Sequence, residues 1–197
     1  MALAAGFADP VFQSQATFRA VAAAMAEPGH AVALAAGLVP PAGLLATTAA
    51  VLLTLVDFET TVWLDDRLAR TPEVADWLRF HTGCRITRDT DAADFAVIAE
   101  AGEMPPFSHF PQGTAEYPDR SATLVVEVEA MTAAAGQLLT GPGIEGAARF
   151  AAIPLPDGFW HAWQENHAAF PLGIDLVFCS PDAVAGLPRS TRPIREG

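Results

Sequence analysis

The sequence predicts a single α/β domain in which a central mixed β-sheet is sandwiched by helices. Three observations lead to this prediction. Of the 197 residues, 51% are apolar, which is enough to bury a sizeable core without disulfides or a metal. Short β-branched segments alternate along the chain with helical patterns, as is typical of α/β layers. No repeat, low-complexity linker or long charge run divides the chain, so we expect one domain over residues 1–197.

The first half of the chain predicts three helices and two strands. Asp9-Pro10 is typical of an N-cap followed by a first helical residue, and Pro28-Gly29 ends that helix. Two further proline signals, Pro40-Pro41 and Thr71-Pro72, introduce the other two helices. We therefore expect, in order, a helix over 10–26, a strand over 30–34, an apolar and buried helix over 42–55, a strand over 60–64 and a helix over 72–83.

The second half of the chain predicts four strands, one helix and a long loop. Residues 102–118 contain four prolines and two glycines, which indicates an irregular loop of a length that is often functional. The elements expected around it are a strand over 95–98, two neighbouring strands over 121–128 and 136–140, a helix over 159–169 and a strand over 174–179. The tail over 188–197 is basic and interrupted by prolines.

The charges exclude several classes of function. Eleven basic against 23 acidic residues give a net charge of −12, which disfavours a protein that coats DNA or RNA. All eleven basic residues are arginines. Without lysine the chain cannot form a Schiff base with pyridoxal phosphate, nor grip a nucleotide with a Walker-type lysine. Any anion must therefore be held by arginine, backbone N–H groups or helix N-termini.

The cysteines and the hydropathy pattern predict a cytoplasmic protein without membrane contact. Cys84 and Cys179 are too few for a disulfide framework and have no C-x-x-C spacing. Residues 1–7 have neither the basic nor the apolar region of a signal peptide. The longest apolar run, over 42–56, is shorter than the ~20 residues that span a bilayer.

No short motif specifies a reaction. The turn over 139–144 follows a strand and has two glycines, but a tight structural turn is favoured over a phosphate loop because G-x-G-x-x-G is absent. No serine stands in G-x-S-x-G. Partial metal-ligand spacings occur at His81, Cys84, His161, Glu165 and His167, but they complete no metal motif, so we expect no metal.

Two segments remain open to two interpretations. The loop over 110–120 contains Thr114, Tyr117 and an Asp-Arg step just before a strand. It suits either an ordered loop for a ligand or partner, or an Ω-type connection packed on itself. Residues 187–195 hold three of the eleven arginines, including Arg189. They suit either docking on an acidic partner or anion, or a solvated terminus.

A set of short motifs runs in order from about residue 7 to 192. They are Thr17-Phe18-Arg19, Ala24-Met25-Ala26-Glu27-Pro28-Gly29, Leu78-Arg79-Phe80-His81-Thr82-Gly83, Gly113-Thr114, Ala122-Thr123-Leu124, Leu139-Thr140-Gly141-Pro142-Gly143-Ile144, Phe170-Pro171-Leu172-Gly173-Ile174-Asp175 and Leu187-Pro188-Arg189-Ser190-Thr191. Taken in order, these motifs resemble the PhnH family, which supplies one of the subunits of the carbon–phosphorus (C–P) lyase system. The ordered set is specific although no single motif is.

The resemblance implies a fold similar to that of pyridoxal-phosphate-dependent transferases, with the cofactor site lost. The absence of lysine agrees with that loss. The resemblance further implies a complex with subunits G, I and J that converts a phosphonate and ATP to a ribose 1-phosphonate 5-triphosphate and releases adenine. In such a complex this chain is expected to be required but noncatalytic, and to form a homodimer when isolated.

The family pattern transfers no catalytic residue, so the matched motifs supply only candidates for a ligand cleft or an interface. We expect Arg79, His81, Thr114 and the turn Gly141–Gly143 to border a remnant cleft for a phosphorylated small molecule. The other candidates are Tyr117, Asp175 and Arg189.

The alternative function is a stand-alone transferase or hydrolase, or a nucleotide- or phosphonate-binding module, that uses a cleft near His81 and Gly141–Gly143. Trp160 and Trp163 are candidate anchors for a dimer interface, with at least one expected in the core.

Overall fold

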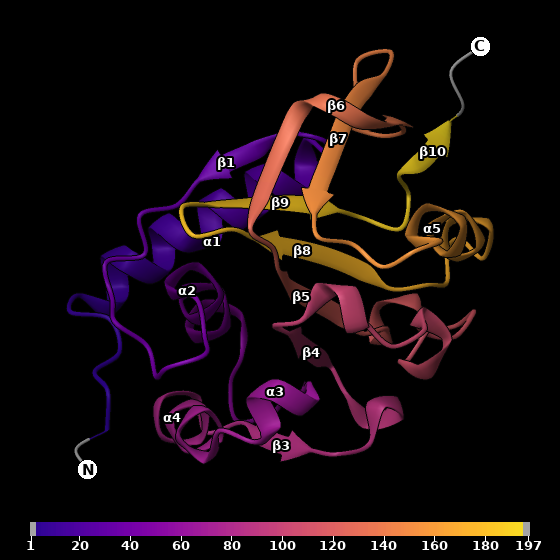
Figure 1. Cartoon of the computed structure of the whole chain (residues 1–197). Coiled ribbons are helices and arrows are strands. Elements are labelled where there is room, and N and C mark those ends of the chain that lie inside the picture. Colours follow the sequence, from indigo (N-terminus) through magenta and orange to yellow (C-terminus); the bar gives the residue numbers. More distant parts are fainter. Residues whose placement is uncertain (1–2, 195–197) are drawn as a thin grey trace.

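The computed structural model describes residues 3–194, which form a mixed α/β fold around one large sheet (Figure 1). The helices are α1 (Pro10–Ala26), α2 (Ala46–Leu55), α3 (Asp66–Ala69), α4 (Pro72–Thr82) and α5 (Phe159–Ala168). The strands are β1 (Ala31–Ala33), β2 (Thr61–Leu64), β3 (Arg85–Thr87), β4 (Phe95–Ile98), β5 (Thr123–Glu127), β6 (Ala130–Thr140), β7 (Ala148–Ile153), β8 (Asp175–Cys179), β9 (Ala183–Leu187) and β10 (Arg192–Ile194).

Within residues 3–194 the large sheet has seven strands in the order β1-β9-β8-β5-β4-β2-β3. The strands from β8 to β3 are parallel, whereas β9 and β1 are antiparallel to their neighbours, so the predicted mixed sheet is confirmed. The chain passes from β2 to β3 on one side and then crosses to β4 on the other side of β2. This crossing is a topological switch point, where ligands bind most often in open α/β sheets.

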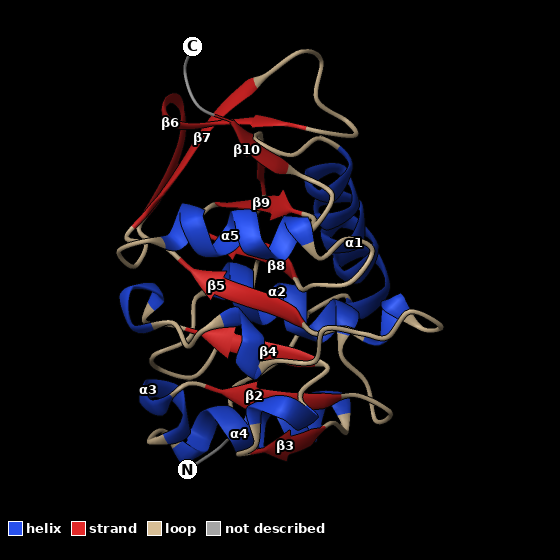
Figure 2. Ribbon diagram, turned by 90° about the vertical axis from the view of Figure 1, so that its right-hand side faces the viewer, coloured by secondary structure: helices blue, strands red, loops and turns tan. Residues whose placement is uncertain are grey.

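The two faces of the sheet are covered differently (Figures 1 and 2). On one face α1, α2 and α4 pack on an apolar cluster that includes Val62, Val97 and Val125. On the other face α5 and residues of the 101–122 loop pack with the second sheet, β10-β6-β7, around a second cluster. The expected sandwich of helices is therefore correct for one face only. Sequence reasoning missed the second sheet because β7 and β10, the two strands that pair with β6, carry no distinct strand pattern.

Local signals located most helices well. Asp9 caps α1 with its carboxylate on the amide of Phe12, and Gly83 ends α4 in the left-handed conformation. The buried face of α1 is formed by small residues, so Phe12 and Phe18 are left exposed. Helix α2 is buried as expected but begins at Ala46, because residues 41–44 form a turn rather than helix.

Two predictions about the second half need correction. The expected neighbours over 121–128 and 136–140 lie in different sheets, since β5 pairs with β4 and β8 whereas β6 pairs with β7 and β10. The tail is not a solvated end: β10 pairs with β6, and the Trp163 indole donates to the Thr191 carbonyl at 3.0 Å. Residues 195–197 of that tail lie outside the described residues.

No described helix combines the length and apolar character needed to cross a bilayer.

Candidate functional site

The carboxyl edge of the parallel strands is hollowed and lined by charged side chains. Asp65 directly follows β2, Arg88 follows β3 and Glu127 ends β5. Because parallel strands end at the same edge of a sheet, these side chains gather on one side of the molecule. This edge includes the switch point next to β2, and it is therefore the candidate site in this fold.

Three arginines line the hollow at the carboxyl ends of β2 and β3, which we call the arginine hollow. Its volume is about 660 Å³, and Arg70, Arg79 and Arg88 reach it from the end of α3, from α4 and from the segment after β3. Trp63 forms part of its wall, and Asp66 and Asp76 are its acidic members. Asp66 forms a loose ion pair with Arg70 and Asp76 forms one with Arg79, each at 3.4 Å. All four side chains are at least half exposed.

Acidic residues dominate the adjoining hollows at the ends of β4 and β5. Asp65 is buried, and its carboxylate accepts hydrogen bonds from the amides of Leu68, Ala99 and Glu100 at 2.7–3.0 Å. These bonds fasten the start of α3 to the end of β4. Asp65 is therefore committed to holding this edge together.

Glu127 is buried at the end of β5 and lines the hollow there. Its Oε1 accepts the amide of Leu45 at 2.7 Å, so it caps α2, whose own N-cap residue has no capping side chain. Burial raises the pKa of the Glu127 carboxyl, and the Leu45 amide and the nearby Arg67 guanidinium oppose this shift. Glu127 is thus a buried acid without a hydrogen-bonded basic partner among the described residues.

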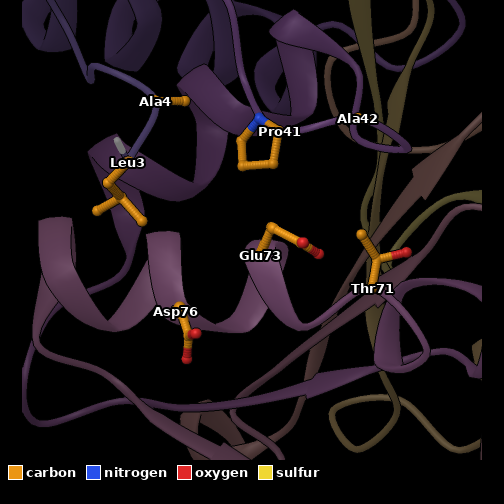
Figure 3. Close-up of a pocket in the computed structure, with 7 residues that line it drawn as sticks. All are labelled: Leu3, Ala4, Pro41, Ala42, Thr71, Glu73 and Asp76. Carbon is orange, nitrogen blue, oxygen red and sulfur yellow. The ribbon is translucent and has the colours of Figure 1, made fainter. Parts of the chain in front are cut away.

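A separate hollow of about 600 Å³ lies between the N-terminal segment and α4 (Figure 3). Leu3, Ala4 and Pro41 lie on one side of it, and Glu73 and Asp76 of α4 lie on the other. The lining carries two carboxylates and no basic group among the described residues. This hollow therefore does not suit an anionic ligand.

Among the candidates from the sequence, only Arg79 lies in a hollow of the carboxyl edge. His81 lies in the same last turn of α4 as Arg79, but its Nε2 contacts the carbonyl of Ala4 at 3.0 Å. The Trp77 indole donates to the same carbonyl at 2.9 Å, and the His81 and Trp77 rings lie 4.9 Å apart. His81 therefore fastens the N-terminal segment to α4.

Asp175 and Arg189 form a mostly buried ion pair at the amino end of β8. The Arg189 Nε lies 3.1 and 3.2 Å from the two carboxylate oxygens, and its Nη2 donates to Asp175 and to Ser121. Its Nη1 donates to the carbonyl of Pro118 at 2.9 Å and approaches that of Pro171 at 3.4 Å. Arg189 thus joins the long loop, β8 and the C-terminal segment, and has no donor left for a ligand.

Thr114 and Tyr117 belong to a loop that packs on itself. Their backbone groups exchange two hydrogen bonds of 3.1 Å, and the Thr114 hydroxyl accepts the amide of Tyr117. The Arg120 guanidinium lies 4.2 Å from the centre of the Tyr117 ring. These contacts favour the Ω-type interpretation of the loop over 110–120.

The turn Gly141–Gly143 packs against backbone, as the structural interpretation expected. A Cβ at Gly143 would lie 1.8 Å from the Ala26 carbonyl oxygen, and one at Gly141 would lie 2.9 Å from that of Ser190. Both glycines also have positive φ. Because α1 and this turn lie at the far end of the sheet from α4, His81 and Gly141–Gly143 do not border one cleft (Figures 1 and 2). The expected shared cleft is therefore corrected.

The remaining nucleophile and ligand candidates are dispersed. Cys84 and Cys179 are buried, and burial raises the pKa of both thiols, that of Cys179 to about 12. His161 contacts Glu165 at 3.5 Å on the exposed surface of α5, and His167 contacts the carbonyl of Arg189. Within residues 3–194 no three metal-ligating side chains come together.

Trp163 is in the core and Trp160 packs partly against it.

Sequence reasoning missed the carboxyl-edge residues Arg70, Arg88 and Glu127, as well as Trp63. A positional signal existed for Glu127, which ends the apolar segment that forms β5, but not for Arg88, because β3 is the three-residue segment Arg-Ile-Thr. Such residues gather at one edge only if the strands are parallel. The motif-based candidates instead marked turns and ion pairs that hold the fold together.

Comparison with known proteins yields similarity over almost the whole chain. A family model described as bacterial phosphonate metabolism protein (PhnH) matches residues 5–193. The chain is 44% identical over 190 residues to the alpha-D-ribose 1-methylphosphonate 5-triphosphate synthase subunit PhnH of Rhizobium meliloti (strain 1021), covering 96% of this chain and 94% of the relative. It is 34% identical over 180 residues to a putative C-P lyase subunit protein, HtxG, of Stutzerimonas stutzeri, covering 91% and 85%.

Proposed function

Because the chain belongs to the PhnH family of bacterial phosphonate metabolism proteins, we propose that it is a subunit of an α-D-ribose 1-methylphosphonate 5-triphosphate synthase. One observation carries this proposal: the 44% identity to the Rhizobium subunit extends over 96% of this chain and 94% of that protein. The second relative, a putative C-P lyase subunit, agrees with the same role in phosphonate metabolism.

The proposal extends to the partners and the reaction. Subunits G, I and J complete the complex, which joins a phosphonate to the ribose triphosphate part of ATP and releases adenine. This chain is required for assembly and turnover but supplies no catalytic group. The internal bonds of Asp175, Arg189 and His81 support that role, because these side chains are engaged in holding the fold.

Three further properties belong to the proposal. The chain acts without pyridoxal phosphate, since it has no lysine for a Schiff base, although its fold is similar to that of the transferases which use this cofactor. It acts in the cytoplasm. It forms a homodimer when isolated, and the exposed Val11, Phe12 and Phe18 of α1 provide apolar surface that association would cover.

The test is co-purification of this chain with subunits G, I and J, followed by an assay of adenine release from ATP and methylphosphonate. We expect a stable complex whose turnover is lost when this chain is left out. The control adds back the Arg192→Ala variant, whose side chain is exposed, and we expect it to restore turnover. Turnover by the isolated chain, or full turnover without it, would contradict the proposal.

A further inference from the structure

We propose that the arginine hollow binds a phosphate- or phosphonate-type oxyanion through Arg70, Arg79 and Arg88. Nothing in the motif pattern marks Arg70 or Arg88, which join Arg79 only in the folded chain. Binding is a property of the isolated chain, so it is tested separately from the role in the synthase.

The charge distribution supports this site. The protein carries −12 overall and has only eleven basic residues, yet three of them line one hollow against two aspartates. The three arginines come from separate elements and converge on a common space. Guanidinium groups bind phosphate-type oxyanions through paired N–H donors, and in a lysine-free protein they are the side chains suited to this task.

The donors of these arginines are available. Arg88 makes no hydrogen bond or ion pair within the described residues. Arg70 and Arg79 have only their loose contacts of 3.4 Å with Asp66 and Asp76, one helical turn away. Exposed ion pairs of this kind contribute little to stability, so an incoming anion can replace them at small cost. Arg189, with every donor in use, shows the contrasting structural arrangement.

The position and size of the hollow also suit a small ligand. Its volume of about 660 Å³ lies within the ~300–1,000 Å³ typical of ligand pockets. It lies at the carboxyl ends of β2 and β3, beside the switch point to β4. Pro72, Ala75, Asp76 and Arg79 line it, so one face of α4, from its first turn to its last, forms a wall of the hollow.

The site is tested by calorimetric titration of the full chain with tripolyphosphate, methylphosphonate and orthophosphate at low ionic strength. We compare the wild type with Arg70→Gln, Arg79→Gln and Arg88→Gln. Arg19→Gln is the matched control, because Arg19 is an exposed arginine on α1 whose side chain, within residues 3–194, hydrogen-bonds only to Gln15. Circular dichroism checks that all variants are folded.

We expect at least one of the three probes to bind saturably, with one probe molecule bound per chain. Each hollow variant should weaken this binding about tenfold, the typical effect of losing a charge-assisted hydrogen bond, while Arg19→Gln leaves it unchanged. A preference for tripolyphosphate assigns the site to polyphosphates, and a preference for methylphosphonate assigns it to phosphonates; either supports the site. No saturable binding of any probe at millimolar concentration, or equal weakening by Arg19→Gln, would overturn it.

Discussion

The two edges of the parallel sheet differ in how they use charge. At the amino edge, Asp94 accepts the amide of Thr61 at 2.7 Å, and Asp175 is paired with Arg189. At the carboxyl edge, Arg88 is unpaired among the described residues and Glu127 is buried without a hydrogen-bonded base. The amino edge is closed by saturated contacts, whereas the carboxyl edge keeps hollows and available donors. Charged residues thus stabilise the fold at the amino edge, whereas at the carboxyl edge Asp65 does so and the arginines of the hollow remain available for a ligand.

The largest effect is expected from breaking the closed edge with Arg189→Ala. This change leaves Asp175, a mostly buried carboxylate, without its partner and detaches the 118–121 segment. Because the two side chains are still 13% and 21% exposed, we expect a loss of about 2–4 kcal/mol, below the full cost of an uncompensated buried charge. Urea unfolding followed by circular dichroism measures it. The exposed Arg192→Ala control should change stability by less than about 0.5 kcal/mol, and equal losses in both variants would contradict the comparison.

A smaller, pH-dependent effect is expected from Glu127→Gln at the open edge. Because the folded-state pKa of Glu127 is raised above its ordinary 4.5, the folded protein holds this proton more tightly than the unfolded chain. The resulting stability is fully present below pH 4.5 and is lost as the pH rises through the folded-state pKa. Glutamine retains an oxygen for the Leu45 amide and does not titrate.

The measurement is the free energy of unfolding of the wild type and Glu127→Gln as a function of pH. The stability of the variant relative to the wild type should increase as the pH rises from 4 toward 8. A pH-independent difference between the two proteins would show that Glu127 is not a destabilised buried acid, and would remove this contrast between the edges.

The reactivity of the Cys84 and Cys179 thiols measures how often the core is exposed to solvent. Both cysteines are buried, and the raised pKa of Cys179, about 12, leaves it almost entirely protonated at pH 8. We expect neither thiol of the native protein to react with a thiol reagent before unfolding, and both to react in denaturant. Arg189→Ala should accelerate labelling because it raises the unfolded population, whereas rapid labelling of the native wild type would contradict the burial of the two thiols.

The smallest effect on stability is expected from Arg88→Gln. Its side chain is exposed and has no partner among the described residues, so the free energy of unfolding should change by less than about 0.5 kcal/mol. Thermal unfolding in the absence of anions measures this. A loss comparable to that of Arg189→Ala would mean that Arg88 holds the fold rather than remaining available.

Sequence patterns located elements well where a local cause acts. The Asp9-Pro10 signal and Gly83 give the ends of α1 and α4, and the apolar runs give β4 and β8. The short strands β7, β9 and β10 were missed because they are defined by pairing with distant segments rather than by their own composition. The motif-based site was likewise dispersed, since Gly143 and Arg189 have structural roles that a motif does not distinguish from binding.

The sequence by itself determined the α/β class, the family and the exclusion of lysine-dependent chemistry, because these depend on composition, local periodicity and ordered motifs. Only the tertiary structure decided which arginines are committed and which are available. Arg189 and Arg88 are the same residue type, each within a short polar segment, and nothing local separates them. The difference arises because β8 and the long loop surround one guanidinium with acceptors, while the parallel strands bring the other to an open edge.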